Sequence, residues 1–123
     1  MAVLLVIEDD TELQRMIRLV LEKRGHQVYT AENGVEALYQ INACRPALIV
    51  LDLMMPLASG EAVLEYLRST PDLHGTRVLV VSALPTAHLT AEQLGADDLL
   101  QKPVHISTLV ARVEKLLRQG ESE

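Results

Sequence analysis

The pattern that most constrains the fold is a repeated alternation of short apolar runs with segments of helical periodicity. The run at 47–51, Ala-Leu-Ile-Val-Leu, is uniformly apolar and rich in branched residues, which is typical of a strand buried on both faces of a parallel sheet. Other short strands are predicted at 3–7, 27–31, 77–81 and 98–101, and a helical segment follows each strand. This alternation predicts an α/β domain with a parallel sheet, helices on both faces and right-handed crossovers.

The predicted helices begin at residues that cap helices well. The candidate caps are short polar side chains before each apolar stripe: Asp10 or Thr11, Asn33 and Ser59. The first helix carries a stripe spaced i, i+3, i+4, i+7 and i+8, formed by Leu13, Met16, Ile17, Val20 and Leu21.

The second half of the chain has shorter elements. Residues 69–76 contain Pro71 and Gly75 and are predicted to form a loop. A short fourth helix is expected from Pro85-Thr86 to Leu94, and the last helix is expected over 106–118. Residues 119–123 are then a polar tail.

Composition narrows the class of protein. The 123 residues fit one domain, and the formal net charge of −6 argues against nucleic acid as a direct partner. The single cysteine, Cys44, excludes an internal disulfide and suits a reducing compartment. The apolar start at 1–7 lacks a basic flank, and no run approaches the roughly 20 apolar residues of a membrane span, so we expect a cytoplasmic protein without a membrane segment.

Polar side chains stand at the ends of four of the five predicted strands. They are Glu8-Asp9, Asp52, Ser82 and Lys102. Because the carboxyl ends of parallel strands share one edge, where ligands bind in open α/β sheets, we expect these groups to converge, although periodicity leaves the strand order open.

The convergent groups suggest a chemistry. Three neighbouring carboxylates repel one another, and Mg²⁺, which prefers carboxylate and water oxygens, relieves that repulsion. We interpret Asp52 as a nucleophile that forms an aspartyl phosphate beside such an ion. Lys102 would contact the phosphoryl oxygens, and the Ser82 hydroxyl would donate to one of them.

Each of these residues has a common structural role when taken alone. An aspartate after a strand usually caps a helix or forms a turn, a lysine is usually solvated, and a serine at a strand end usually bonds to the backbone. Met54 and Met55 suit packing, and Asp10 suits a cap better than a metal ligand. The histidines lack metal-ligand spacing and are predicted to be surface or capping residues: His26, His74, His88 and His105.

Together, these motifs resemble the receiver domain of response regulators, the phosphoacceptor half of two-component signalling. The resemblance covers the whole chain and is carried by Glu8-Asp9, Asp52-Leu53-Met54-Met55-Pro56 with Gly60, Ser82-Ala83, Gly95-Ala96-Asp97-Asp98 and Lys102-Pro103. It implies a flavodoxin-like (βα)5 sheet with strand order 2-1-3-4-5. The receiver domain would cover residues 1–118.

The resemblance also implies roles and partners. Asp52 would accept a phosphoryl group from a phosphohistidine on a sensor histidine kinase or phosphotransfer protein, as a self-phosphorylating acceptor rather than a turnover enzyme. Asp9, Asp52 and the Met54 backbone carbonyl would bind Mg²⁺ directly, and Glu8 would act through a water. Phosphorylation would draw Ser82 inward and shift the face made by the fourth helix, fifth strand and fifth helix, which would meet a downstream effector or a second copy. The Lys102-Pro103 bond is expected to be cis.

The sequence departs from the family pattern at several positions. Leu99 stands where the family usually has a switch tyrosine or phenylalanine, and Val104 stands where phenylalanine is common. The segment from Ser82 to Lys102 is slightly short, which predicts a short or displaced fourth helix. Met54 and Leu84, each two residues beyond a site residue, are apolar; we expect them to hinder water and to prolong the phosphorylated state.

Three other functions are compatible with parts of the pattern. A pseudo-receiver would keep the fold as a binding or dimerisation module, which Leu99 allows but the intact site residues disfavour. A phosphohydrolase of the haloacid-dehalogenase type needs a second carboxylate two residues after the nucleophile, where this chain has Met54. A flavin-binding flavodoxin needs a phosphate-cradling loop after the first strand, where Glu8-Asp9-Asp10 would repel phosphate.

Overall fold

The computed structural model describes residues 2–55 and 59–121, and it confirms the predicted alternation of strands and helices. The elements in chain order are β1 (Val3–Ile7), α1 (Thr11–Lys23), β2 (Gln27–Ala31), α2 (Gly34–Cys44), β3 (Leu48–Asp52), α3 (Gly60–Ser69), η1 (Pro71–Leu73), β4 (Arg77–Ser82), α4 (Ala87–Gln93), β5 (Asp98–Gln101) and α5 (Ile106–Glu121). Among the helices in these ranges, none has the length and apolarity that a bilayer crossing requires.

The five strands form one parallel sheet in the order β2-β1-β3-β4-β5, as the family resemblance implies. The pairing is in register at the carboxyl ends, where Asp52 lies opposite Val81 and Ser82 lies opposite Gln101. This register brings the ends of β1, β3, β4 and β5 to one edge of the sheet, here called the carboxyl edge.

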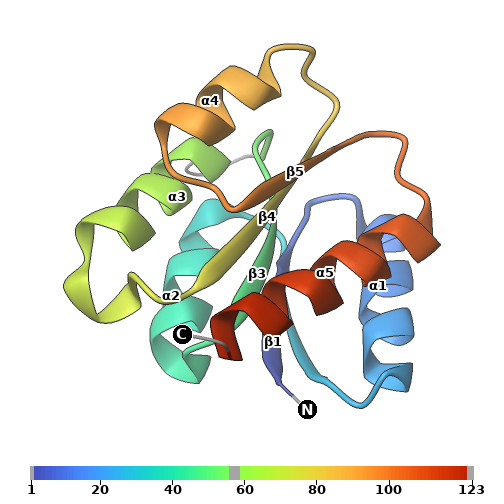
Figure 1. Ribbon diagram of the computed structural model, residues 1–123. Helices are drawn as coiled ribbons and strands as arrows, with labels where there is room; N and C mark the ends of the chain where they lie inside the picture. The colour runs from blue at the N-terminus through green and yellow to red at the C-terminus, as the bar shows by residue number, and fades with distance from the viewer. Residues whose placement is uncertain (1, 56–58, 122–123) are drawn as a thin grey trace.

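Two apolar layers hold the sheet, one on each face. Helices α2, α3 and α4 lie on one side of the sheet, and α1 and α5 lie on the other (Figure 1). Alternate residues of each strand point to opposite faces, so Leu5 and Ile7 join the layer under α2, α3 and α4, whereas Leu4 and Val6 join the layer under α1 and α5. The central strand β3 is buried along its whole length, as its uninterrupted apolar run predicts.

The predicted caps bond as expected. Asp10 Oδ1 accepts from the backbone N–H groups of Glu12 and Leu13, both at 3.1 Å. Asn33 and Ser59 cap α2 and α3 in the same way. These contacts fix where each helix leaves its strand.

The apolar stripe of α1 is only partly buried. Ile17 and Leu21 are buried against the sheet, but Met16 on the same stripe is 49% exposed. Periodicity identifies the inner face of a helix, whereas the neighbouring helix decides how much of that face is covered.

The structure differs from the prediction at the end of the last helix and within residues 69–76. Helix α5 continues to Glu121, beyond the predicted end at 118, so 119–121 belong to the helix and not to a polar tail; Ser122 and Glu123 lie outside the described residues. One glycine in a helix, here Gly120, costs only about 1 kcal/mol, which does not end it. The predicted loop at 69–76 contains the short helix η1, because buried Leu73 anchors a turn there.

The prediction that every histidine is a surface or capping residue is wrong for His26. Its side chain is only 6% exposed. The Nδ1 atom accepts from the backbone N–H of Ala2 at 3.2 Å, and the Nε2 atom lies 3.8 Å from Glu114 Oε2. This contact between the α1–β2 connection and the residue before β1 has no signal in local sequence.

Candidate functional site

Three carboxylates from two strand ends meet at the carboxyl edge. Glu8 and Asp9 follow β1, and Asp52 ends β3. One oxygen from each of these carboxylates lies within 4.8 Å of the others. Glu8 and Asp52 are buried, whereas Asp9 is exposed, so the cluster opens to solvent on the Asp9 side.

Lys102 brings an ammonium group into the same cluster. Its Nζ atom lies 2.8 Å from Glu8 Oε1 and 3.3 Å from Asp52 Oδ2. The backbone N–H of Lys102 donates to the Ser82 carbonyl at 2.8 Å, which holds the end of β5 against β4. The Lys102-Pro103 peptide bond is cis, as expected from the resemblance.

Burial and the neighbouring charges together alter the pKa values of Glu8 and Lys102. Burial raises the pKa of Glu8 from its ordinary 4.5 to about 7, although the hydrogen bond from Lys102 and that from the Asp10 backbone act in the opposite direction. Burial lowers the pKa of Lys102, but the hydrogen bond and charge of Glu8, joined by Asp52, outweigh it, so the pKa is raised. Lys102 therefore stays an ammonium at neutral pH.

Asp52 is held by the loop that follows it. The backbone N–H of Met54 donates to Asp52 Oδ1 at 3.0 Å, while Oδ2 faces Lys102. Met54 itself is 55% exposed. Pro56, the last residue of the family motif, lies outside the described residues.

Gly60 lets helix α3 begin directly against the strand that carries Asp52. A Cβ at this position would lie 2.2 Å from the Asp52 carbonyl oxygen and 2.6 Å from Leu53 Cα. Since both neighbours are backbone atoms, no rotamer change relieves the overlap. The absence of a side chain at Gly60 therefore sets the path of the chain that leaves Asp52.

Ser82 is fully buried at the end of β4, one residue beyond Val81, the register partner of Asp52. Its Oγ atom accepts from the backbone N–H of Leu84 at 3.1 Å. The hydroxyl proton is not used by that bond. The structure thus places Ser82 on the strand beside Asp52, with its oxygen held by the following loop.

Gln14 supports the site and was missed by the sequence analysis. Its Nε2 atom donates to the carbonyls of Glu8 at 3.0 Å and Ala31 at 3.1 Å, which ties the ends of β1 and β2 together below the carboxylates. A glutamine on an amphipathic helix carries no sequence signal that it joins two strands. The role of Gln14 becomes visible only once β1 and β2 are known to be neighbours in the sheet.

The donor set fits a hard divalent cation. With all groups ionised, three carboxylates and one ammonium leave two negative charges in excess. Carboxylate oxygens that open to water on one side suit Mg²⁺, which keeps several waters when bound. Glu8, Asp9 and Asp52 can therefore hold such an ion.

Comparison with known proteins assigns the family. The family model described as "Response regulator receiver domain" matches residues 4–114. Over 120 residues the chain is 38% identical to response regulator MprA of Mycobacterium avium (strain 104), covering 98% of this chain and 53% of that protein.

Solved structures agree with this assignment. The receiver domain of the Francisella response regulator 1452 has a TM-score of 0.88 at 33% identity, with 97% of this chain and 98% of that chain covered. A putative response regulator from Chloroflexus aurantiacus J-10-fl has a TM-score of 0.89 at 30% identity, with 95% and 98% covered. The chain belongs to the response-regulator receiver domains of two-component signalling. It spans about half the length of the curated relatives that it matches.

Proposed function

We propose that this domain is a Mg²⁺-dependent phosphoacceptor switch in which Asp52 receives a phosphoryl group from a phosphohistidine. The observation that supports this most is the contact of Asp52 with both Lys102 and the acidic pair within one small cluster. Phosphoryl transfer to a carboxylate requires a cationic group and a bound metal ion beside it. Lys102 and the carboxylates around Asp52 suit these two roles.

The chain's residues have distinct parts in this transfer. An Asp52 oxygen attacks phosphorus, the P–N bond to the donor breaks, and the electron pair leaves with the imidazole nitrogen. Lys102, now shared between Glu8 and Asp52, neutralises the charge that arrives on the phosphoryl oxygens. Asp9 and Asp52 with the Met54 carbonyl, and Glu8 through a water, would hold a Mg²⁺ ion, which would supply further charge neutralisation.

Ser82 would report the phosphorylated state. Its hydroxyl keeps a free proton that can be donated to a phosphoryl oxygen, and its Oγ bond to the Leu84 backbone would then carry the change into the loop before α4. Leu99 occupies the usual position of an aromatic switch and, like Leu84 and Leu94, is partly buried and packed against the layer under α2, α3 and α4. Repacking of these leucines would replace aromatic rotation.

The partners follow from this chemistry. A histidine kinase or phosphotransfer protein would dock over the carboxyl edge to present its phosphohistidine to Asp52. The face formed by α4, β5 and α5 would change on phosphorylation and would contact an effector or a second copy. Both proposals rest on family membership and on the position of Ser82 beside that face.

Mass spectrometry after incubation with acetyl phosphate and Mg²⁺ tests the proposal. We expect a gain of one phosphoryl group that requires Mg²⁺ and is abolished in Asp52→Ala. Asp72→Ala, which removes an exposed carboxylate in η1, is the matched control and should still be phosphorylated. A wild-type protein that gains no mass would instead support a pseudo-receiver, and continued turnover of phosphate esters would support a hydrolase.

A further inference from the structure

The two carboxylates that follow β1 are held in different ways. The side chain of Glu8 has two partners, because Oε1 faces Lys102 and Oε2 accepts from the backbone N–H of Asp10 at 3.2 Å. Within the part of the chain that the structure describes, the exposed side chain of Asp9 accepts no hydrogen bond and forms no ion pair. The place of the Asp9 carboxylate is therefore set by its main chain.

The side chain of Gln14 holds that main chain. The Glu8 carbonyl, which belongs to the peptide group that joins Glu8 to Asp9, accepts from Gln14 Nε2 at 3.0 Å. The second donor of the same amide goes to the Ala31 carbonyl at 3.1 Å, which also accepts from the backbone N–H of Glu8 at 3.0 Å. Both polar groups of the Glu8 backbone are thus fixed to the end of β2, and the peptide before Asp9 cannot rotate without breaking a bond to Gln14.

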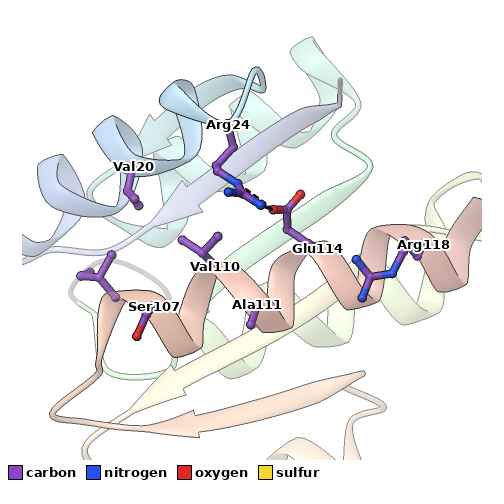
Figure 2. Close-up of a pocket in the computed structure, with 8 residues that line it drawn as sticks. Val20, Arg24, Ser107, Val110, Ala111, Glu114 and Arg118 are labelled. Carbon is purple, nitrogen blue, oxygen red and sulfur yellow. Dashed lines mark hydrogen bonds and ion pairs between the residues drawn. The ribbon is translucent and has the colours of Figure 1, made fainter.

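Helix α1 itself does not depend on these two bonds. Ile17 and Leu21 are buried against the sheet. At the far end of the helix, the Arg24 guanidinium donates to the Glu114 carboxylate on α5, as Figure 2 shows. Loss of the Gln14 amide would therefore free the acidic segment after β1 while the helix stays in place.

We propose that Gln14 is a positioning residue for the cation site, which orients the peptide that carries the Asp9 carboxylate toward the other two carboxylates. This inference rests on the proposed function, because it concerns the Mg²⁺ that phosphoryl transfer would use. Asp52 keeps its own bonds to the Met54 backbone and to Lys102 when Gln14 is changed. Loss of the Gln14 amide should therefore weaken Mg²⁺ binding and leave the attack by Asp52 unchanged.

Calorimetric titration of the unphosphorylated protein with Mg²⁺ tests the first half of this expectation. Gln14→Met keeps the length of the side chain and removes both donors, so it should raise the dissociation constant for Mg²⁺ about tenfold. Gln14→Asn keeps the amide but is one methylene shorter, so it cannot reach both carbonyls and should also weaken binding. Neither measurement depends on phosphorylation.

Phosphorylation by acetyl phosphate at a series of Mg²⁺ concentrations tests the second half. In Gln14→Met, the Mg²⁺ concentration that gives half of the maximal rate should rise by the same factor as the dissociation constant. The rate at saturating Mg²⁺ should stay at the wild-type value. A residue that only stabilised the fold would not produce this split between affinity and maximal rate.

Two variants serve as controls. Ile17→Val shortens a buried side chain of the same helix and lowers stability, but it leaves the bonds to Glu8 and Ala31 intact. Gln40→Met makes the same chemical change on α2. Both variants should bind Mg²⁺ as the wild type does.

Three results would overturn the inference: an unchanged dissociation constant in Gln14→Met, a lowered maximal rate at saturating Mg²⁺, or an equal loss of Mg²⁺ affinity in Ile17→Val. Failure of the proposed function has a different signature. A protein that binds Mg²⁺ in a Gln14-dependent way but gains no phosphoryl group would contradict the phosphoacceptor role and retain the positioning role of Gln14.

Discussion

The two ends of the sheet each hold a cluster of charged residues, but the balance of charge differs. At the carboxyl edge, three carboxylates share one ammonium, that of Lys102. At the opposite end, the single carboxylate of Asp97 faces two guanidinium groups, with Arg68 at 2.9 Å and Arg77 at 3.4 Å. The cluster at the carboxyl edge therefore has more carboxylates than cations, whereas the cluster around Asp97 has more cations than carboxylates.

The cluster at the amino ends is also tied to the backbone by hydrogen bonds. Asp97 Oδ2 accepts from the Val78 backbone N–H at 2.7 Å. Arg68 donates to the carbonyls of Gly95 and Thr76, each at 2.9 Å. These bonds fasten α3 to the starts of β4 and β5. The difference teaches that a charged cluster made for stability uses its groups in bonds to the surrounding backbone, whereas a cluster made for binding keeps an excess of negative charge for its ligand.

The largest expected effect is on stability, and it contrasts one glycine at each end of the sheet, Gly60 and Gly75. Gly60→Ala should destabilise the protein by about 3 kcal/mol, because its Cβ would overlap backbone atoms of Asp52 and Leu53. Gly75→Ala, before β4, meets no atom within 4 Å and should change the unfolding free energy by less than about 0.5 kcal/mol. Urea denaturation measures both, and similar values would show that the close approach at Gly60 is relaxed in solution.

The next effect is a dependence of stability on pH that arises from Glu8 at the carboxyl edge. A carboxyl whose pKa is higher in the folded protein binds protons more tightly when folded, so it favours folding at low pH. With its pKa raised from 4.5 to about 7, Glu8 should make the metal-free protein lose up to about 3 kcal/mol of stability as the pH rises through that range.

Denaturation in EDTA from pH 4 to pH 8 checks this slope. Glu8→Gln should remove most of it, whereas Glu65→Gln, which changes an exposed carboxyl on α3, should retain it. A wild-type curve without that loss between pH 4.5 and 7 would contradict the assignment to Glu8.

A smaller effect is expected from the loss of the Asp97 carboxylate at the amino ends of the strands. Asp97→Asn leaves two guanidinium groups without their carboxylate and should cost about 2 kcal/mol, with the side chain only 20% exposed. Asp72→Asn, an exposed carboxyl in η1, serves as the control and should be near neutral. Equal denaturation midpoints for the two variants would remove the contrast between the two ends of the sheet.

The smallest effect concerns the lifetime of the phosphorylated state. Met54 and Leu84 present apolar side chains beside the site, so Met54→Asn with Leu84→Glu should admit water and speed dephosphorylation several-fold, or about 1 kcal/mol in barrier. Leu89→Glu, on the exposed side of α4, should leave the rate unchanged. Mass spectrometry at successive times measures the rate at which each phosphorylated protein loses its phosphoryl group. An unchanged or slower rate in the double variant contradicts the role of Met54 and Leu84 in shielding the site from water.

Much of the fold could be predicted because its signals are local. Apolar runs, caps and strand-end side chains depend on neighbours in sequence, and they indicated Glu8, Asp9, Asp52, Ser82 and Lys102 as one group. The strand order needed the family resemblance, because periodicity does not say which strands pair.

What could not be predicted depends on contacts between distant segments. The burial of His26 depends on Ala2 and Glu114, and the role of Gln14 depends on the pairing of β1 with β2. The direct contact of Glu8 with Lys102 joins residues from the first and last strands, and their charge balance has no counterpart in local sequence.

The most direct test of the charge imbalance is the effect of Mg²⁺ on unfolding. At pH 8 we expect Mg²⁺ to raise the unfolding free energy of the wild type by about 1 to 3 kcal/mol at concentrations well above its dissociation constant. That increase should vanish in Asp52→Asn and persist in Asp97→Asn. An equal response of all three proteins, or no response of the wild type, would contradict a divalent cation site at the carboxyl edge.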